Sequence, residues 1–185
     1  MHALQRITTS YIPTEDRIRV SGETPDGQTV VIWLSLRLAQ RMVPVLARWL
    51  EGQAPLPPEQ FASNSEAQQA ARVEMVQSFV QEAARAELKP QKPVSAAAPL
   101  EQWMARTLNV ERSGQEIALI LRSGEGEGDA QAARLTMPAK VLRQWLGMLM
   151  EAYRKGDWPL DKWPSWLQGG AAAGVTGAAG GGVLH

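Results

Sequence analysis

Apolar and polar positions alternate along the first third of the chain, as is typical of β-strands. Residues 4–11 and 17–21 show this two-residue period, and residues 29–34 (TVVIWL) form an unbroken apolar run. The sequence Pro25-Asp26-Gly27 separates the last two segments and favours a tight turn, because proline presets φ and glycine accepts a positive φ. We therefore predict a β-hairpin whose last strand is buried on both faces.

The period changes to that of a helix after residue 34. Ser35 is suited to cap a helix over 36–51, and the apolar stripe of this helix comprises Leu38, Ala39, Met42, Val43, Leu46, Trp49 and Leu50. Pro44 lies within the helix, where it removes one backbone hydrogen bond. We therefore predict a kink or a restart at this residue.

A second helix is predicted over residues 65–88, after a segment rich in proline. Ser63 and Glu66 have the spacing of a capping box. The apolar stripe is thin and comprises Val73, Val76, Val80 and Ala84, with Phe79 beside it. So narrow a stripe fits a helix that packs on one side only, or a helix that forms a dimer seam.

The second half repeats the order of the first after a linker over 89–99, which is rich in proline and alanine. Residues 100–107 fit either a short helix or the approach to a strand. Ser113-Gly114 favours a tight turn, and 123–129 is predicted to be a loop. The predicted strands are 109–112, 117–121 and 132–135.

The last long helix is predicted to begin at the capping residue Thr136, with Pro138 in its first turn and Gly156 at its end. Its apolar stripe comprises Val141, Leu142, Trp145, Leu146, Leu149 and Tyr153. A segment rich in tryptophan and proline follows, and from residue 169 the Gly/Ala composition predicts disorder.

These elements predict an α+β fold of two β-hairpin-plus-helix (ββα) units around a shared antiparallel-sheet core, with an extra middle helix. The expected divisions are a first unit, the middle helix, the linker, a second unit with the Trp/Pro segment and a disordered tail, over 1–60, 61–88, 89–99, 100–168 and 169–185. The alternative is a β head followed by a helical stalk.

The two units suggest an internal repeat with an offset of 99 residues. In the strands this offset aligns Ile18 with Ile117, and Val20 with Leu119. In the helices it aligns Met42, Val43, Leu46 and Leu50 with Val141, Leu142, Trp145 and Leu149. Unrelated ββα segments share such a period, so a true duplication and a chance match both stay open.

Charge and composition argue against several classes of partner and of chemistry. The 19 basic and 19 acidic side chains give a formal net charge of zero, which removes the general electrostatic argument for nucleic acid or a membrane as partner. There is no cysteine, and histidine occurs only at positions 2 and 185. Disulfides, thiolate metal sites and histidine-based catalysis are therefore not expected. We expect a cytoplasmic protein that is not an enzyme and has no cofactor, metal site or membrane partner.

Two acidic motifs invite a chemical interpretation. Glu125, Glu127 and Asp129 alternate with glycines, and their oxygens suit Ca²⁺, but the spacing is not that of an EF-hand loop. Glu15 and Asp16 are adjacent, and adjacent side chains of an extended chain point to opposite faces. A solvated loop and a solvated turn are the favoured interpretations.

Arg37, Arg41 and Arg48 are candidate nucleic-acid contacts in a locally basic first third of the chain. Acidic residues are interleaved with the arginines of this region, and no aromatic residue alternates with them as a stacking platform. A solvated or partner-facing helix surface is therefore favoured.

Three of the seven tryptophans, Trp158, Trp163 and Trp166, lie in the Trp/Pro segment. That segment must fold back over its own core or meet a partner, because three indoles in water are costly, and folding back is favoured. Together with Val76, Phe79 and Val80 of the middle helix, these tryptophans form the candidate interaction surface.

The function expected from the sequence is that of a non-catalytic protein–protein interaction or assembly protein that self-associates, with a homodimer favoured. The alternative is a nucleic-acid-associated or regulatory protein that uses the three arginines. The third is a small enzyme or ligand-binding domain with a carboxylate-based site.

Overall fold

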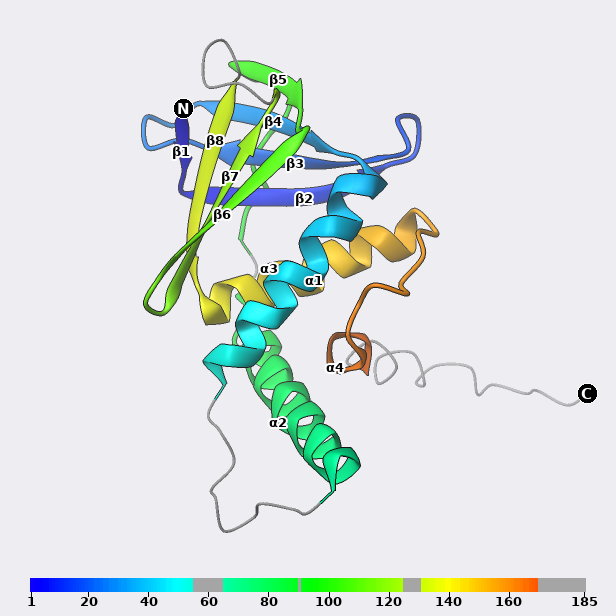
Figure 1. Ribbon diagram of the computed structural model, residues 1–185. Coiled ribbons are helices and arrows are strands. Elements are labelled where there is room, and N and C mark those ends of the chain that lie inside the picture. The colour runs from blue at the N-terminus through cyan, green and yellow to red at the C-terminus, as the bar shows by residue number, and fades with distance from the viewer. Residues whose placement is uncertain (55–64, 90, 125–130, 170–185) are drawn as a thin grey trace, which may run out of the picture.

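The fold is α+β, as the sequence predicts, with two four-stranded sheets and four helices in the described part of the chain (Figure 1). This computed structural model describes all residues except 55–64, 90, 125–130 and 170–185. The predicted GEGEGD loop and the Gly/Ala tail therefore lie almost wholly outside the described residues.

Each sheet combines three consecutive antiparallel strands with one parallel edge strand. The first has the order β2 (Arg6–Ile12), β3 (Arg17–Glu23), β4 (Thr29–Leu34) and β5 (Glu101–Met104). The second has the order β1 (His2–Leu4), β8 (Ala132–Pro138), β7 (Glu116–Arg122) and β6 (Thr107–Ser113). The sheets are thus mixed, where the sequence predicts antiparallel strands throughout.

The two edge strands are exchanged between the halves of the chain. β5 precedes the second hairpin but pairs in parallel with β4, and Ile32 lies opposite Trp103. β1 precedes the first hairpin but pairs in parallel with β8, and Leu4 lies opposite Leu135. The single strand predicted over 4–11 is therefore wrong, because the chain leaves one sheet and enters the other at Gln5.

Gly22 makes room for this crossing. An ideal Cβ on Gly22 would lie 2.5 Å from Cδ1 of Leu4, far inside van der Waals contact. Because Gly22 has no side chain, Leu4 packs against β3 at the point where the chain passes from one sheet to the other.

The helix α1 (Leu36–Gln53) begins as predicted. The backbone N–H of Leu38 donates to Oγ of Ser35 at 3.3 Å, which confirms the cap. The helix is continuous across the exposed Pro44, so the predicted restart does not occur there. Every residue of its predicted apolar stripe is buried.

In α2 and α3 the cap lies two residues after the predicted one. α2 (Glu66–Ala86) is capped by Ser65, which accepts from the N–H of Gln68 at 3.3 Å, whereas Ser63 lies outside the described residues. α3 (Ala139–Lys155) follows Pro138, so Thr136 as its cap is wrong. The reason is that β8 continues its ladder with β7 as far as Pro138. The short α4 (Ser165–Gln168) ends the described chain.

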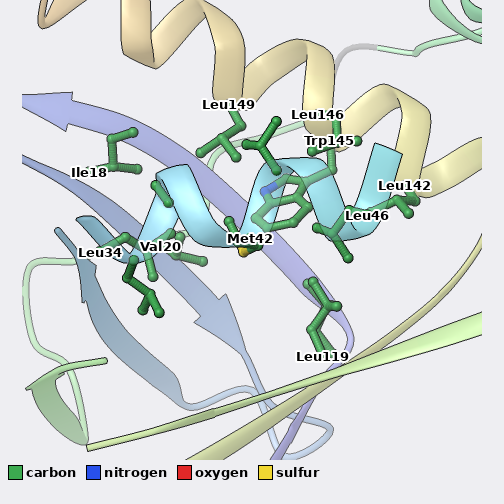
Figure 2. Packing of buried hydrophobic residues seen from close by; sticks show 14 of the residues in the cluster. Ile18, Val20, Leu34, Met42, Leu46, Leu119, Leu142, Trp145, Leu146 and Leu149 are labelled. Carbon is green, nitrogen blue, oxygen red and sulfur yellow. The ribbon is translucent and has the colours of Figure 1, made fainter. Parts of the chain in front are cut away.

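One hydrophobic cluster joins both sheets with α1, α3 and α4. Figure 2 shows Met42 and Leu46 of α1 between Leu119 of β7 and Trp145 of α3. The indole N–H of Trp145 donates to Oγ1 of Thr9 on β2 at 3.0 Å, so the largest side chain of this layer has its polar group satisfied. The two halves therefore share a single core.

The helices of the two halves align four residues away from the predicted offset. Seven buried residues of α1 each correspond to a buried residue of α3 that lies 103 positions later in the sequence. They are residues 39, 42, 43, 46, 47, 49 and 50 of α1 and residues 142, 145, 146, 149, 150, 152 and 153 of α3. Nine residues separate β7 from β8, whereas five separate β3 from β4, and this difference of four accounts for the change from 99. The helix alignments at 99 are therefore wrong; the duplication itself stays a prediction.

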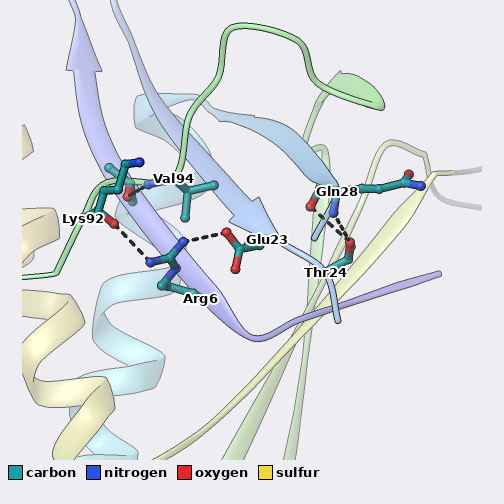
Figure 3. Close-up of polar contacts among 7 residues, drawn as sticks. Arg6, Glu23, Thr24, Gln28, Lys92 and Val94 are labelled. Atoms are coloured by element: carbon teal, nitrogen blue, oxygen red, sulfur yellow. Dashed lines mark hydrogen bonds and ion pairs between the residues drawn. The ribbon is translucent and has the colours of Figure 1, made fainter. Parts of the chain in front are cut away.

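The linker runs along the outside of β2 (Figure 3). The N–H of Val94 donates to Oγ1 of Thr8 at 2.8 Å, and Val94 is buried. Arg6 donates to the carbonyl of Lys92 at 3.3 Å and forms an ion pair with Glu23 at 2.6 Å. These contacts fix the path that brings β5 to the edge of β4.

Candidate functional site

The helix α2 projects away from the sheets (Figure 1) and contacts the protein body through its C-terminal half. Its buried residues are Gln77, Gln81 and Ala84, which we call the inner face. No residue of α2 before Gln77 is buried. The N-terminal half is therefore a helix largely surrounded by solvent within the described structure.

The predicted apolar stripe of α2 is only partly correct. Ala84 is buried, Val76 and Val80 are half-buried, and Val73 is exposed. Sequence reasoning missed the two glutamines because a hydrophobic pattern counts only apolar residues. Their spacing from Ala84, at 77, 81 and 84, is the one signal that they share its side of the helix.

The inner face is held by hydrogen bonds rather than by apolar packing alone. Nη2 of Arg143 donates to Oε1 of Gln77 at 2.5 Å, and Nε2 of Gln77 donates to the carbonyl of Glu51 at 3.2 Å. Nε2 of Gln81 donates to the carbonyl of Arg143 at 3.1 Å. Gln144 adds a bond to the carbonyl of Ala84 at 2.8 Å. These bonds fix the position of α2 against α1 and α3.

Arg143 lies at the centre of this attachment and is 2% exposed. Burial lowers the pKa of its guanidinium to about 10, and the nearby carboxylate of Glu51 opposes part of that change. Its guanidinium carbon lies 5.0 Å from the ring centre of Trp166, a cation–π contact. The indole of Trp166 donates in turn to Oε1 of Glu51 at 3.1 Å. This arrangement compensates the buried charge and joins α4 to α2.

The opposite side of α2, which we call the outer face, exposes large apolar side chains. Met75 is 72% exposed and Phe79 is 75% exposed. Each lies two residues from a buried glutamine, about 200° around the helix. The outer face comprises Ala71, Arg72, Met75, Phe79, Glu82 and Ala83. Phe79 is a predicted surface residue that the structure leaves exposed, whereas Met75 was not predicted.

A groove of about 500 Å³ lies between α2, α3 and α4. Its apolar lining includes Met148, Met150 and Leu167, and Gly147 opens its floor. Gln81 faces this groove with an Oε1 that has no hydrogen-bond partner among the described residues. The groove borders the outer face only at Glu82.

The three tryptophans of the Trp/Pro segment are buried within the protein itself. The rings of Trp158 and Trp163 each make an edge contact with Tyr153, at 5.1 Å between ring centres. The segment thus folds back over its own core, which is the favoured alternative of the sequence analysis. Little of these side chains is left for a partner, so only the α2 part of the candidate surface is accessible.

Asp16 ties this aromatic cluster to the β2–β3 turn. Its Oδ1 accepts hydrogen bonds from the hydroxyl of Tyr11 at 2.8 Å and from the indole of Trp158 at 3.0 Å. Both bonds favour the carboxylate and lower the pKa of Asp16, with Trp158 the larger cause. Glu15 lies instead 4.0 Å from Arg17 and does not converge with Asp16. Within the described residues no group of three acidic or histidine side chains could hold a metal ion.

Arg37, Arg41 and Arg48 are exposed on one side of α1. Their spacing of four and seven residues places them along a single helical stripe. None of the three forms a hydrogen bond or ion pair with another residue that the structure describes. Their charges are therefore free to meet an anionic partner.

In the part of the chain that is described, no helix is long and apolar enough to cross a membrane. No family model, curated protein or solved structure matches the chain.

Proposed function

We propose that this protein is a non-catalytic assembly protein that associates with a second copy of itself through the outer face of α2. The observation that carries this proposal is the exposure of Met75 and Phe79 on a helix whose other side is firmly attached. Burying one such side chain contributes roughly 1.5–3 kcal/mol. Two of them side by side on a projecting helix are typical of a docking surface.

The attachment of α2 supports a docking role for its free part. The projecting part of α2, residues 66–76, is short enough to be marginally stable as an isolated helix in water, because helix nucleation is costly. Hydrogen bonds from Arg143 and Gln144 hold the C-terminal half in place, so the N-terminal half is presented in a fixed direction. A partner that covers the outer face would stabilise this projecting part without any rearrangement of the core.

Light scattering over ~1 µM to ~1 mM, the range in which weak association is measured, tests the proposal. We expect the mass to rise with concentration toward that of a dimer. Phe79→Gln keeps helix propensity and removes the apolar ring, so it should weaken association at least about tenfold. Val45→Gln is the control, because Val45 is 42% exposed on α1 and lies off the outer face. A monomeric mass throughout would refute self-association, and equal association of the two variants would refute the outer face of α2 as the surface that it uses.

A second candidate function is supported by the stripe of unpaired arginines on α1. Arg37, Arg41 and Arg48 could contact successive phosphates of a nucleic acid. Such binding would weaken steeply with salt, and replacing all three with glutamine would abolish it. A filter-binding assay with single- and double-stranded DNA at two salt concentrations distinguishes this function, since Phe79→Gln should leave it unchanged.

A further inference from the structure

We infer that two copies of α2 pair antiparallel about a two-fold axis at the level of residue 77. This inference rests on the proposed self-association and specifies its geometry. The observation behind it is that the outer face has the same order of charged and apolar residues from either end of the helix, except that the positive and the negative charge exchange places.

Four outer-face residues form one continuous strip along the helix. Arg72, Met75, Phe79 and Glu82 follow one another at spacings of three, four and three residues, which places them on the same side. This is the spacing of apolar positions in a coiled-coil seam. The strip lies across the helix from Gln77. Its residues Met75, Phe79 and Glu82 are exposed and Arg72 is half-buried, so none of the four is buried by the protein body.

The strip is symmetric about residue 77. In an antiparallel pair with this centre, Met75 of each copy lies opposite Phe79 of the other, which gives two sulfur–aromatic contacts. Arg72 of each copy lies opposite Glu82 of the other, which gives two ion pairs. Neither charge has an ion-pair partner among the described residues of its own chain. The small Ala71 and Ala83 exchange places in the same way and allow the helices to approach closely.

A parallel pair lacks these features. It would place the positive Arg72 against its own copy and the negative Glu82 against its own copy, and like charges at these positions repel. It would also bring both protein bodies to the same end, because each body is attached to the C-terminal half of its helix. The antiparallel arrangement places the two bodies at opposite ends of the seam.

Self-complementarity is the reason to prefer a second copy of this chain over an unrelated protein. A two-fold interface uses the same patch on both subunits, so every contact must have a mate within that patch. The outer face meets this requirement for its apolar pair and its charged pair alike. An unrelated partner would not require the symmetry.

Charge reversal tests the pairing. Arg72→Glu and Glu82→Arg each place like charges across the seam and should weaken dimerisation by at least about fivefold. The double variant restores opposite charges in the antiparallel pair and should recover the wild-type affinity. Glu74→Arg is the control, because Glu74 is exposed and lies to the side of the strip. Thermal unfolding of all variants shows whether the fold is kept.

Cross-linking tests the direction independently, and the absence of cysteine makes any introduced thiol unique. In the antiparallel pair, Ala71→Cys of one copy lies opposite Ala83→Cys of another, whereas two copies of Ala71→Cys are separated by ~18 Å along the seam. A short thiol cross-linker should therefore join a mixture of the two variants and leave Ala71→Cys alone uncoupled.

The results of these experiments distinguish the antiparallel pairing from self-association itself. A chain that stays monomeric refutes both self-association and the pairing. A dimer in which the double charge variant stays weak, or in which Ala71→Cys couples to itself, refutes the antiparallel pairing and leaves self-association standing. Recovery by the double variant together with mixed cross-linking establishes the pairing.

Discussion

At the scale of single residues, the aromatic cluster shows two tyrosines in opposite situations. The hydroxyl of Tyr153 is buried without a hydrogen-bond partner in the described structure, and burial raises its pKa. The hydroxyl of Tyr11 donates to Asp16 at 2.8 Å. A buried polar group without a partner costs free energy, whereas a bonded one contributes.

This difference predicts opposite effects for the same chemical change. Tyr153→Phe should leave the free energy of unfolding unchanged or raise it by up to ~1 kcal/mol, because it removes only an unpartnered hydroxyl. Tyr11→Phe should lower it, because Asp16 loses one of its two donors. Urea unfolding of both variants measures the comparison. A clear loss of stability in Tyr153→Phe would mean that its hydroxyl has a partner after all.

The hydrogen bonds of Asp16 predict that the stability of the fold depends on pH in the acidic range. Its pKa in the folded state lies below the ordinary 3.8, because Trp158 and Tyr11 donate to the carboxylate. The unfolded state therefore binds the proton more readily, so this stabilisation is complete above the ordinary pKa and is lost as the pH falls through the folded-state value. Asp16→Asn should lower the melting temperature at neutral pH and flatten its fall in acid. Glu15→Gln, at the adjacent exposed carboxylate, should do neither.

At the scale of elements, a glycine within α3 and the glycine that caps its C-terminal end predict effects of opposite sign. An ideal Cβ on Gly147 would have only Nε2 of Gln81 nearby, at 3.8 Å, so Gly147→Ala should raise stability by about 1 kcal/mol through helix propensity. A Cβ on Gly156 would lie 2.6 Å from the ring of Tyr11, so Gly156→Ala should lower it by about 1–3 kcal/mol through overpacking.

Calorimetry of the two variants tests this pair, with each serving as the control for the other. Since Gly156 has φ of −88°, backbone strain does not enter the comparison. If Gly147→Ala destabilises the protein, the groove between α2 and α3 must be filled in solution by something that the added methyl group displaces.

The elements that the sequence predicts well are those with a strong apolar period. The stripes of α1 and α3 bury their predicted residues, except that Val141 is exposed near the start of α3. α2 was predicted as a helix but with an incomplete inner face. The inner face has glutamine where an apolar residue would be expected, because the buried Arg143 requires a hydrogen-bonding partner. The sequence pattern does not show which helix supplies that partner.

The candidate site was predictable to the same limited degree. Phe79 stands out beside a thin stripe, and a dimer seam was one of the two interpretations of that stripe. The tryptophans are the more conspicuous residues, yet Trp158 and Trp163 are buried against Tyr153, and Trp166 is buried against Arg143. Their destination depends on tertiary packing that no local period records.

At the scale of the whole molecule, the decisive feature is the exchange of edge strands. β1 and β5 have three and four residues, too few to show a period, and each pairs with a strand more than 60 residues away. No local signal predicts such a pairing. The sequence analysis expects two ββα units, whereas in the structure four strands precede α1, four more lie between α2 and α3, and each half completes the sheet of the other.

The exchange predicts that neither half folds alone, although the two together do. Fragment 1–88 lacks β5, which covers the edge of β4, and its α2 lacks Arg143. Fragment 91–185 lacks β1, which covers β8. Each should give a dispersionless amide NMR spectrum or aggregate, since an unpaired apolar edge is a site of aggregation. An equimolar mixture should recover the dispersed spectrum and a cooperative melt.

Residues 6–88 provide the matched control, because this fragment differs from 1–88 only in lacking β1. Mixed with 91–185, it should form a complex that melts at lower temperature, since Leu4 no longer packs opposite Leu135 at the edge of β8. If it equals 1–88 in this assay, or if either fragment folds cooperatively by itself, the strand exchange is not what unites the halves. In that case the contacts of α3 with β2, such as the bond from Trp145 to Thr9, must carry the association instead.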